Sequence, residues 1–247
     1  MTESTLNRPR EIAENIARVQ ERIAAACARA ARPFNAVTLC AVTKTRPVED
    51  VLAAIAAGVC DIGENYVQEA RDKIPAVRAQ RAGADFTCHL IGHLQTNKVK
   101  YAVRFADVLQ TVDSKECLQE IAKCIQKLYN TGDGQEQSAR SLRILIEVNL
   151  SGSAGRAGVA PEAALELAGT ARETPGVTLA GLMGIAPEWG GEDTARPHFA
   201  RLREIFEQLP PENRQILSMG MSGDFAAAIA EGATLLRIGT AIFGARI

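Results

Sequence analysis

Lys44 stands where an apolar stretch of the chain ends, a position that could support amine chemistry. It follows the run Leu39-Cys-Ala-Val-Thr43, so its aliphatic stem would lie against hydrocarbon while its amine reaches the end of a strand. Partial burial favours the neutral amine, the form that condenses with an aldehyde to give a Schiff base. A surface lysine just past a strand end is the simpler alternative. Lys44 is therefore a candidate attachment site for an aldehyde.

Hydroxyl and glycine residues form two pairs near the C-terminus. Ser222 precedes Gly223, and Gly239 precedes Thr240. Hydroxyl groups and the backbone N–H groups of such loops bind phosphate, and glycine lets the backbone approach the phosphate oxygens. Glycines that only make turns are the alternative, but they do not explain two such pairs after successive apolar runs. We therefore predict a phosphate site formed by Ser222, Gly239 and Thr240.

Arg237 and Asn65 are further candidates for contact with a ligand. Arg237 lies two residues before Gly239, so the alternation of a strand puts both on the same side. A guanidinium beside a pyridine nitrogen would keep that nitrogen unprotonated and make the ring a poor electron sink; an ion pair inside the fold is an equally good interpretation. Asn65, with Glu64, would either contact a ligand or cap the following helix. His89 falls within a predicted strand and is expected to be a hydrogen-bonded interior histidine.

The predicted elements explain how residues so far apart could meet. A helix-spaced apolar pattern behind Pro9 predicts an N-terminal helix over residues 11–31. After it, short apolar runs alternate with helical patterns. The predicted strands are Val37–Val42, Asp61–Ile62, Phe86–Ile91, Val108–Val112, Arg143–Asn149, Thr178–Met183, Gln215–Ser218 and Thr234–Ile238. The predicted helices between them are Val48–Ala57, Val67–Gln80, Gln95–Ala102, Lys115–Tyr129, Pro161–Arg172, Thr194–Leu209 and Phe225–Ala230.

A short C-terminal turn follows the last predicted strand and completes eight successive units, which place the chain in the α/β class and favour a closed (β/α)₈ TIM barrel over an open doubly wound sheet. We expect one domain over residues 1–247, in which residues 1–33 add an N-terminal helix and residues 36–247 form the barrel. Ligands of this fold bind where the strands end and the following loops begin. Lys44, Asn65, Ser222, Gly239 and Thr240 lie at such positions and Arg237 lies near the end of its strand, so the fold would gather these six residues at one mouth of the barrel.

Charge and composition limit the kinds of partner. Among 247 residues, 28 Lys and Arg against 29 Asp and Glu leave a formal charge of −1, which offers no electrostatic basis for binding nucleic acid or an anionic membrane. No apolar run approaches the ~20 residues that a membrane helix needs. The six cysteines include no C-x-x-C pair and no cluster with histidine. We expect a monomeric cytoplasmic protein that binds a small molecule and no metal.

Six segments carry a resemblance that extends over nearly the whole chain. They are Ala41–Thr45, Gly63–Glu69, His89–Lys98, Gly181–Met183, Leu217–Ser222 and Arg237–Gly244. In these segments the chain resembles the pyridoxal phosphate homeostasis proteins, the single-barrel relatives of the alanine racemase N-terminal domain. The resemblance implies pyridoxal 5′-phosphate (PLP) as the cofactor, with Lys44 as its Schiff-base lysine and Ser222, Gly239 and Thr240 around its phosphate. It also implies that Arg237 faces the pyridine nitrogen and that Asn65 lies near the ring.

The same resemblance implies a function in vitamin B6 balance: binding PLP to buffer the free aldehyde and supplying PLP-dependent apoenzymes, without an established catalytic turnover. One alternative is a racemase-like PLP enzyme acting on an amino acid, which needs a second base that alanine racemases take from a tyrosine, helped by a separate β domain. The chain ends at Ile247, without room for that domain, and we expect Tyr66, Tyr101 and Tyr129 in helical stretches outside the barrel. The other alternative is an aldolase whose lysine attacks a sugar-phosphate carbonyl.

The chain departs from the family pattern at two places. After the fifth predicted strand, relatives usually carry an acidic stretch ahead of Lys-x-Gly, whereas here Gly152-Ser-Ala-Gly155 precedes Arg156-Ala-Gly158. After Ser222, an acidic residue common in relatives is replaced by Gly223, although Asp224 follows. The first departure bears on the loop at residues 151–160 and on its role in ligand release or partner contact, and neither departure touches Lys44.

Overall fold

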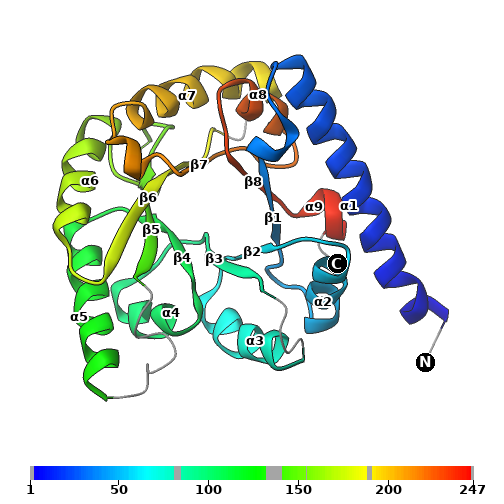
Figure 1. Cartoon of the computed structure of the whole chain (residues 1–247), viewed down its shortest axis with the longest axis horizontal. Helices are drawn as coiled ribbons and strands as arrows, with labels where there is room; N and C mark the ends of the chain where they lie inside the picture. The colour runs from blue at the N-terminus through cyan, green and yellow to red at the C-terminus, as the bar shows by residue number, and fades with distance from the viewer. Residues whose placement is uncertain (1–2, 81–84, 132–140, 154, 188–190, 246–247) are drawn as a thin grey trace.

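A closed barrel of parallel strands, ringed by helices, forms the body of the molecule (Figure 1). The computed structural model describes residues 3–80, 85–131, 141–153, 155–187 and 191–245. Within these residues eight strands pair in chain order, and the first closes on the last by pairing Thr38–Ala41 with Leu235–Ile238. The predicted (β/α)₈ TIM barrel is confirmed, and so is the additional N-terminal helix.

The strands are short and lie close to the predicted runs, because strands buried on both faces of a parallel barrel are apolar almost throughout. Their bounds are β1 (Thr38–Val42), β2 (Asp61–Glu64), β3 (Thr87–Leu90), β4 (Val108–Val112), β5 (Leu142–Val148), β6 (Val177–Gly184), β7 (Ile216–Ser218) and β8 (Leu235–Ile238). The largest displacement of a single strand end is at β2, which continues past Ile62 to Glu64. It does so because Gly63 and Glu64 pair with His89 and Leu90 of β3.

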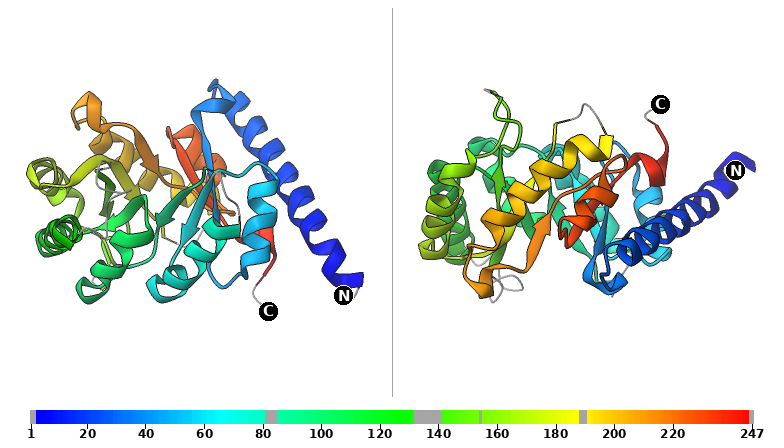
Figure 2. Two further views of the ribbon diagram at one scale, coloured as in Figure 1. Left: turned by 60° about the horizontal axis from the view of Figure 1, so that its bottom comes forward. Right: turned by 90° about the horizontal axis from the view of Figure 1, so that it is seen from above.

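Helices follow the strands around the outside of the barrel (Figure 2). The α-helices are α1 (Glu3–Arg29), α2 (Val48–Ala56), α3 (Val67–Gln80), α4 (Val99–Phe105), α5 (Lys115–Thr131), α6 (Ala164–Glu173), α7 (Gly191–Phe206), α8 (Phe225–Ala230) and α9 (Thr240–Phe243). Single 3₁₀ turns occur at Phe34–Ala36, Thr96–Lys98, Pro161–Ala163 and Pro211–Asn213. The prediction that the first helix starts behind Pro9 is wrong, since α1 runs through this proline.

The N-terminal helix α1 packs along the outside of the barrel against α2, α8 and α9 (Figure 1). The residues that supplied its helical pattern form the buried face: Ile12, Ile16, Val19, Ile23 and Cys27. Each is at most 2% exposed, and full burial of such a side chain contributes roughly 1.5–3 kcal/mol. The helix therefore belongs to the same hydrophobic core as the barrel.

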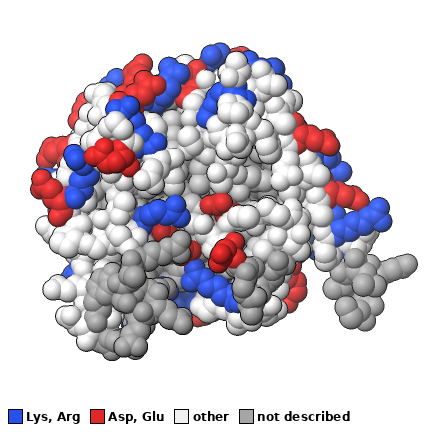
Figure 3. Space-filling model, in the orientation of Figure 1, with Lys and Arg blue, Asp and Glu red and all other residues white. Residues whose placement is uncertain are grey.

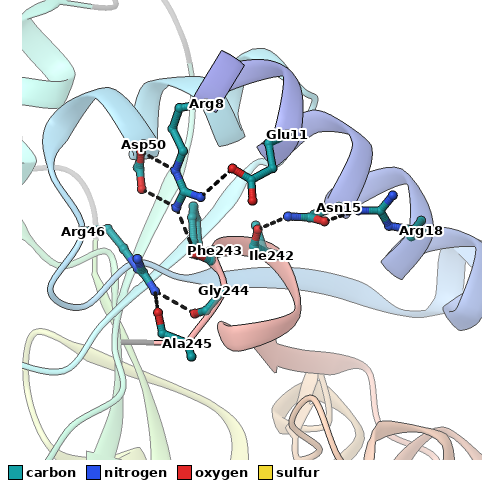
Figure 4. Close-up of polar contacts among 10 residues, drawn as sticks. All are labelled: Arg8, Glu11, Asn15, Arg18, Arg46, Asp50, Ile242, Phe243, Gly244 and Ala245. Carbon is teal, nitrogen blue, oxygen red and sulfur yellow. Dashed lines mark hydrogen bonds and ion pairs between the residues drawn. The ribbon is translucent and has the colours of Figure 1, made fainter. Parts of the chain in front are cut away.

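Polar contacts fix the position of α1 relative to the C-terminal end of the chain (Figure 4). Arg8 donates two hydrogen bonds to Asp50 in α2 and one, at 2.9 Å, to the carbonyl oxygen of Phe243 in α9. Asn15 donates to the carbonyl oxygen of Ile242 at 2.8 Å. The contacts of Arg8 lie next to Pro9 and attach this part of α1 to α2 and α9, although proline removes one hydrogen bond from the helix.

A bulge in β6 depends on glycine. Ile144 of β5 pairs with Leu179, but the next residue of β5 pairs with Gly181, so one residue of β6 is left out of the ladder. Gly181 has φ 150°, and a Cβ atom there would lie 1.9 Å from the carbonyl oxygen of Ile216 in β7. Only glycine allows the two strands to approach this closely. The bulge sets the register of the end of β6, where Gly184 contacts the site described below.

Charged side chains of both signs are interspersed over the face of the barrel shown in Figure 3. This distribution agrees with the near-zero net charge of the sequence. None of the helices that the structure describes has the length and apolarity that a membrane crossing requires. Over the same part of the chain, no group of three or more His, Cys, Asp or Glu side chains could hold a metal ion.

Candidate functional site

A cavity of about 620 Å³ opens at the carboxyl ends of the strands. Its lining includes every residue predicted to bind the ligand: Lys44, Asn65, Ser222, Arg237, Gly239 and Thr240. The volume falls within the range of sites for small ligands and cofactors. Apolar side chains from several strand ends complete the wall, among them Val42, Ile91, Leu150 and Ile185. The barrel thus brings the predicted residues to one place, although they are spread over most of the sequence.

Lys44 lies in a tight turn directly after β1. The backbone N–H of Arg46 donates to the carbonyl oxygen of Thr43 at 3.0 Å and closes the turn around Lys44. Thr45, the third residue of the turn, has φ 62°, a left-handed conformation that is uncommon for a β-branched residue. Lys44 is half buried and lines the cavity.

The ends of β7 and β8 bring two hydroxyl groups together at the cavity wall. The hydroxyl of Thr240 donates to that of Ser222 at 3.1 Å. A Cβ atom at Gly223 would have no atom within 4 Å, so the space beside this pair is open. Asp224 accepts the N–H of Met221 at 2.6 Å and holds the loop. Two adjacent hydroxyl donors with open space beside them suit an anion such as phosphate.

Arg237 is anchored by a chain of buried hydrogen bonds that crosses the barrel interior. Its Nη1 donates to the hydroxyl of Ser218 at 2.6 Å, and that hydroxyl donates to Oε1 of Gln110 at 2.6 Å. Nε2 of Gln110 lies 2.9 Å from Nδ1 of His89, and Nε2 of His89 lies 2.8 Å from Asp61. Because arginine and the amide nitrogen can only donate, the proton of a neutral His89 lies on Nε2, toward Asp61. His89 is therefore a hydrogen-bonded interior histidine, as predicted.

A second contact holds the other end of the guanidinium. Nη2 of Arg237 donates to the carbonyl oxygen of Gly184, at the end of β6, at 3.0 Å. Arg237 is only 4% exposed, and this burial lowers its pKa, while Cys40, Glu147 and Asp224 act in the opposite direction. An arginine remains protonated despite such a change. The cavity wall therefore carries a fixed positive charge at this position.

Glu147 also lines the cavity, and the sequence analysis did not single it out. It lies within β5, is 6% exposed, and its Oε2 atom has no hydrogen-bond partner in the described part of the chain. Burial raises the pKa of its carboxyl group to about 7; Asp113 raises the pKa further and Arg237 opposes the change. The sequence signal that could have found it is a carboxylate inside the otherwise apolar run Leu145–Val148.

Asn65 faces the cavity, but neither it nor Glu64 caps a helix, so the capping interpretation is wrong. Glu64 is the wholly buried last residue of β2 and forms an ion pair with Lys73 at 2.8 Å, whereas α3 begins only at Val67. Oδ1 of Asn65 is buried and has no partner within the described residues. Gly92, also in the cavity wall, packs so closely that a Cβ atom there would lie 2.2 Å from the Asn65 carbonyl oxygen. Asn65 thus presents a buried acceptor in the cavity wall.

The sequence predicts that the three tyrosines lie in helices outside the barrel, and this prediction is only partly correct. Tyr66 is 47% exposed and lies between β2 and α3, so its assignment to a helix is wrong. Tyr101 lies in α4 beneath the cations of Arg71 and Lys100. Neither ring lines the cavity. The side chain of Tyr129 lies outside the described residues.

The loop after β5, which departs from the family pattern, contributes to the cavity. Asn149 organises it: the amide nitrogen donates to the carbonyl oxygens of Ser153 and Arg156, and the amide oxygen accepts two bonds from Ser151. Arg156 and Ala157 line the cavity. Residue 154 lies outside the described residues.

The fold and the cavity define a single-barrel protein with a polar ligand site at the carboxyl ends of its strands. The family model described as the alanine racemase N-terminal domain matches residues 11–247. A pyridoxal phosphate homeostasis protein of Pasteurella multocida is 37% identical over 239 residues, which are 95% of this chain and 97% of that protein. The chain belongs to the pyridoxal phosphate homeostasis proteins, within the alanine racemase N-terminal domain family, so the resemblance in the sequence is confirmed.

Two solved structures are similar over the full length. An unknown protein from Bifidobacterium adolescentis superimposes with a TM-score of 0.85 at 35% identity and covers 98% of this chain and 97% of its own. The structure of PipY from Synechococcus elongatus with PLP bound has a TM-score of 0.75 at 33% identity, and the match covers 94% of this chain and all of PipY.

Proposed function

We propose that this protein binds PLP in the cavity and holds it through a Schiff base on Lys44, as a buffer that keeps the free cofactor in balance. The observation that carries the proposal is the convergence of a half-buried lysine, a hydroxyl pair and a fixed arginine on one cavity of about 620 Å³. The names of the relatives and the PLP bound to PipY support the same cofactor.

Each part of the cavity has a counterpart in the chemistry of PLP, which supplies an aldehyde and an electron-withdrawing pyridine ring when bound. Lys44 offers the amine for the aldehyde, while Ser222, Gly239 and Thr240 surround the phosphate. The buried Oδ1 of Asn65, which has no partner in the described structure, accepts a hydrogen bond from the ligand. Arg237 faces the ring nitrogen.

A fixed guanidinium at the ring nitrogen suits storage better than catalysis. Arginine can only donate, so it keeps the nitrogen unprotonated and limits the capacity of the ring to accept electrons. Tyr66 and Tyr101, two of the tyrosines considered as a second base, do not line the cavity. We therefore propose a monomeric cytoplasmic carrier that supplies PLP-dependent apoenzymes and has no substantial turnover. Sustained production of D-alanine from L-alanine by the PLP-loaded protein would overturn the carrier proposal.

The attachment to Lys44 is tested by spectroscopy and peptide mapping. Purified protein incubated with PLP should absorb in the near-visible, and borohydride should fix a pyridoxyl group on the peptide that contains Lys44. Lys44→Ala should lose this absorbance and keep the far-ultraviolet circular dichroism of the wild type. Lys115→Ala, at an exposed lysine paired with Glu166, is the matched control. A protein that stays colourless, or a label on a different lysine, contradicts the proposal.

A further inference from the structure

A buried lysine lies directly beneath the turn that carries Lys44. Lys73 in α3 is 7% exposed. Its ammonium group donates to the carbonyl oxygen of Thr43 at 2.8 Å and to that of Arg46 at 3.2 Å. These are the first and last residues of the turn in which Lys44 is the second. One buried cation therefore binds the backbone on both sides of Lys44.

Two carboxylates complete the cluster around Lys73. Glu64 and Glu69 approach its ammonium group at 2.8 and 2.6 Å. Glu69 also accepts the backbone N–H of Thr45 at 2.7 Å, and Glu64 accepts the hydroxyl of Thr43. Every neighbour of Lys44 within the turn is thus bonded to the cluster through a backbone or side-chain atom.

The conformation of the turn needs such support. Thr45 has φ 62°, and a non-glycine residue remains in the left-handed region only where surrounding contacts hold it there. Lys73 and Glu69 supply these contacts from below, on the side of α3. A lysine on an unsupported loop would sample many directions, whereas a lysine on a braced turn keeps its stem directed at the cavity that it lines.

We propose that Lys73 is a positioning residue for Lys44: together with Glu64 and Glu69 it braces the turn so that the amine of Lys44 is presented to an aldehyde in the cavity. This inference rests on the proposed function of Lys44. It also explains the Gly63–Glu69 segment, which supplies both carboxylates of the brace.

The test compares two ligands that differ only at the reacting group. PLP has an aldehyde, whereas pyridoxine 5′-phosphate keeps the ring and the phosphate but cannot bond to Lys44. Lys73→Met retains the apolar stem and removes the ammonium group. We expect it to weaken PLP binding at least about tenfold and to slow formation of the borohydride-reducible adduct, while the affinity for pyridoxine 5′-phosphate changes less than about twofold.

Ligand-free protein gives a second readout. The amide hydrogen of Thr45 should exchange faster in Lys73→Met than in the wild type, because the brace is lost. Lys115→Met removes an exposed ion-paired lysine and should change neither readout. If Lys73→Met does not fold, Glu69→Ala replaces it, because the Glu69 side chain is 26% exposed. Glu69→Ala should likewise weaken the binding of PLP more than that of pyridoxine 5′-phosphate.

The outcomes separate this inference from the proposed function. If the wild type forms no reducible adduct with PLP, the proposed function fails and the positioning role fails with it. If the wild type forms the adduct but the variant matches it, the positioning role alone is refuted. An equal loss of affinity for both ligands also refutes it, because a merely structural lysine would affect the whole cavity.

Discussion

Glu147→Gln removes a titratable charge from the cavity wall and keeps the shape of the side chain. Burial raises the pKa of this carboxyl group from its ordinary 4.5 to about 7. The folded protein therefore keeps a proton between about pH 4.5 and 7 that the unfolded chain releases. Because the folded state binds more protons in this range, its free energy of unfolding falls as the pH rises.

The size of the effect follows from the displaced pKa. A change from 4.5 to about 7, at ~1.4 kcal/mol for each tenfold change in the equilibrium constant, corresponds to ~3 kcal/mol of stability. The contribution is present below pH 4.5 and is lost above pH 7. Glutamine cannot ionise, so the variant lacks this loss. As the pH rises from 5 to 8, we expect the free energy of unfolding of the variant to increase by about 2–3 kcal/mol relative to that of the wild type.

Urea unfolding of the ligand-free proteins at a series of pH values measures this difference. Groups that do not interact with Glu147 titrate alike in the two proteins, so their effects cancel and the pH-dependent gap belongs to Glu147 and its charged neighbours Asp113 and Arg237. Glu173→Gln, at an exposed position on α6, is the control and should show no widening gap. A gap between Glu147→Gln and the wild type that stays constant from pH 5 to pH 8 would refute the reasoning, because the carboxyl group would then be ionised in both states.

Two further predictions concern the buried chain that anchors Arg237. Ser218→Ala leaves a charged donor and the amide oxygen of Gln110 buried without this partner, so we expect the free energy of unfolding to fall by ~3–5 kcal/mol. Ser141→Ala, which removes an exposed hydroxyl, is the control, and equal losses in the two variants would contradict the prediction. Nitrogen NMR of the wild type at pH 8 should find the proton of neutral His89 on Nε2; a proton on Nδ1 would contradict the prediction, because the Gln110 amide would then have to present its oxygen to His89.

The fold could be predicted because it depends on local patterns. Apolar runs of strand length alternate with helical periods eight times, and strands buried on both faces need such runs. The errors lie where partners distant in the sequence extend an element. β2 reaches Glu64 because β3 offers it a pairing partner, and α1 extends past Pro9 to a segment in which Arg8 is bonded to α2 and α9.

The candidate site could be predicted in part because the barrel places all its strand ends on one face. Lys44, Ser222 and Thr240 were found from residue type and from their positions just after strands. Their meeting in one cavity follows from the closure of the barrel, which sets β8 beside β1. Glu147 was missed because a position inside a strand does not reveal whether its side chain faces a cavity or a packed core.

The sequence by itself determined the number and order of the elements, the family and the residues that could bind an aldehyde and a phosphate, since these follow from residue type and spacing. Only the tertiary structure decided how those residues are held. The brace of Lys73 under the turn of Lys44 and the chain from Arg237 to Asp61 consist of contacts between different strands and helices. So does the burial that gives Glu147 a pKa of about 7. Such contacts and burial depend on which side chains meet after the barrel closes, which spacing along one chain does not specify.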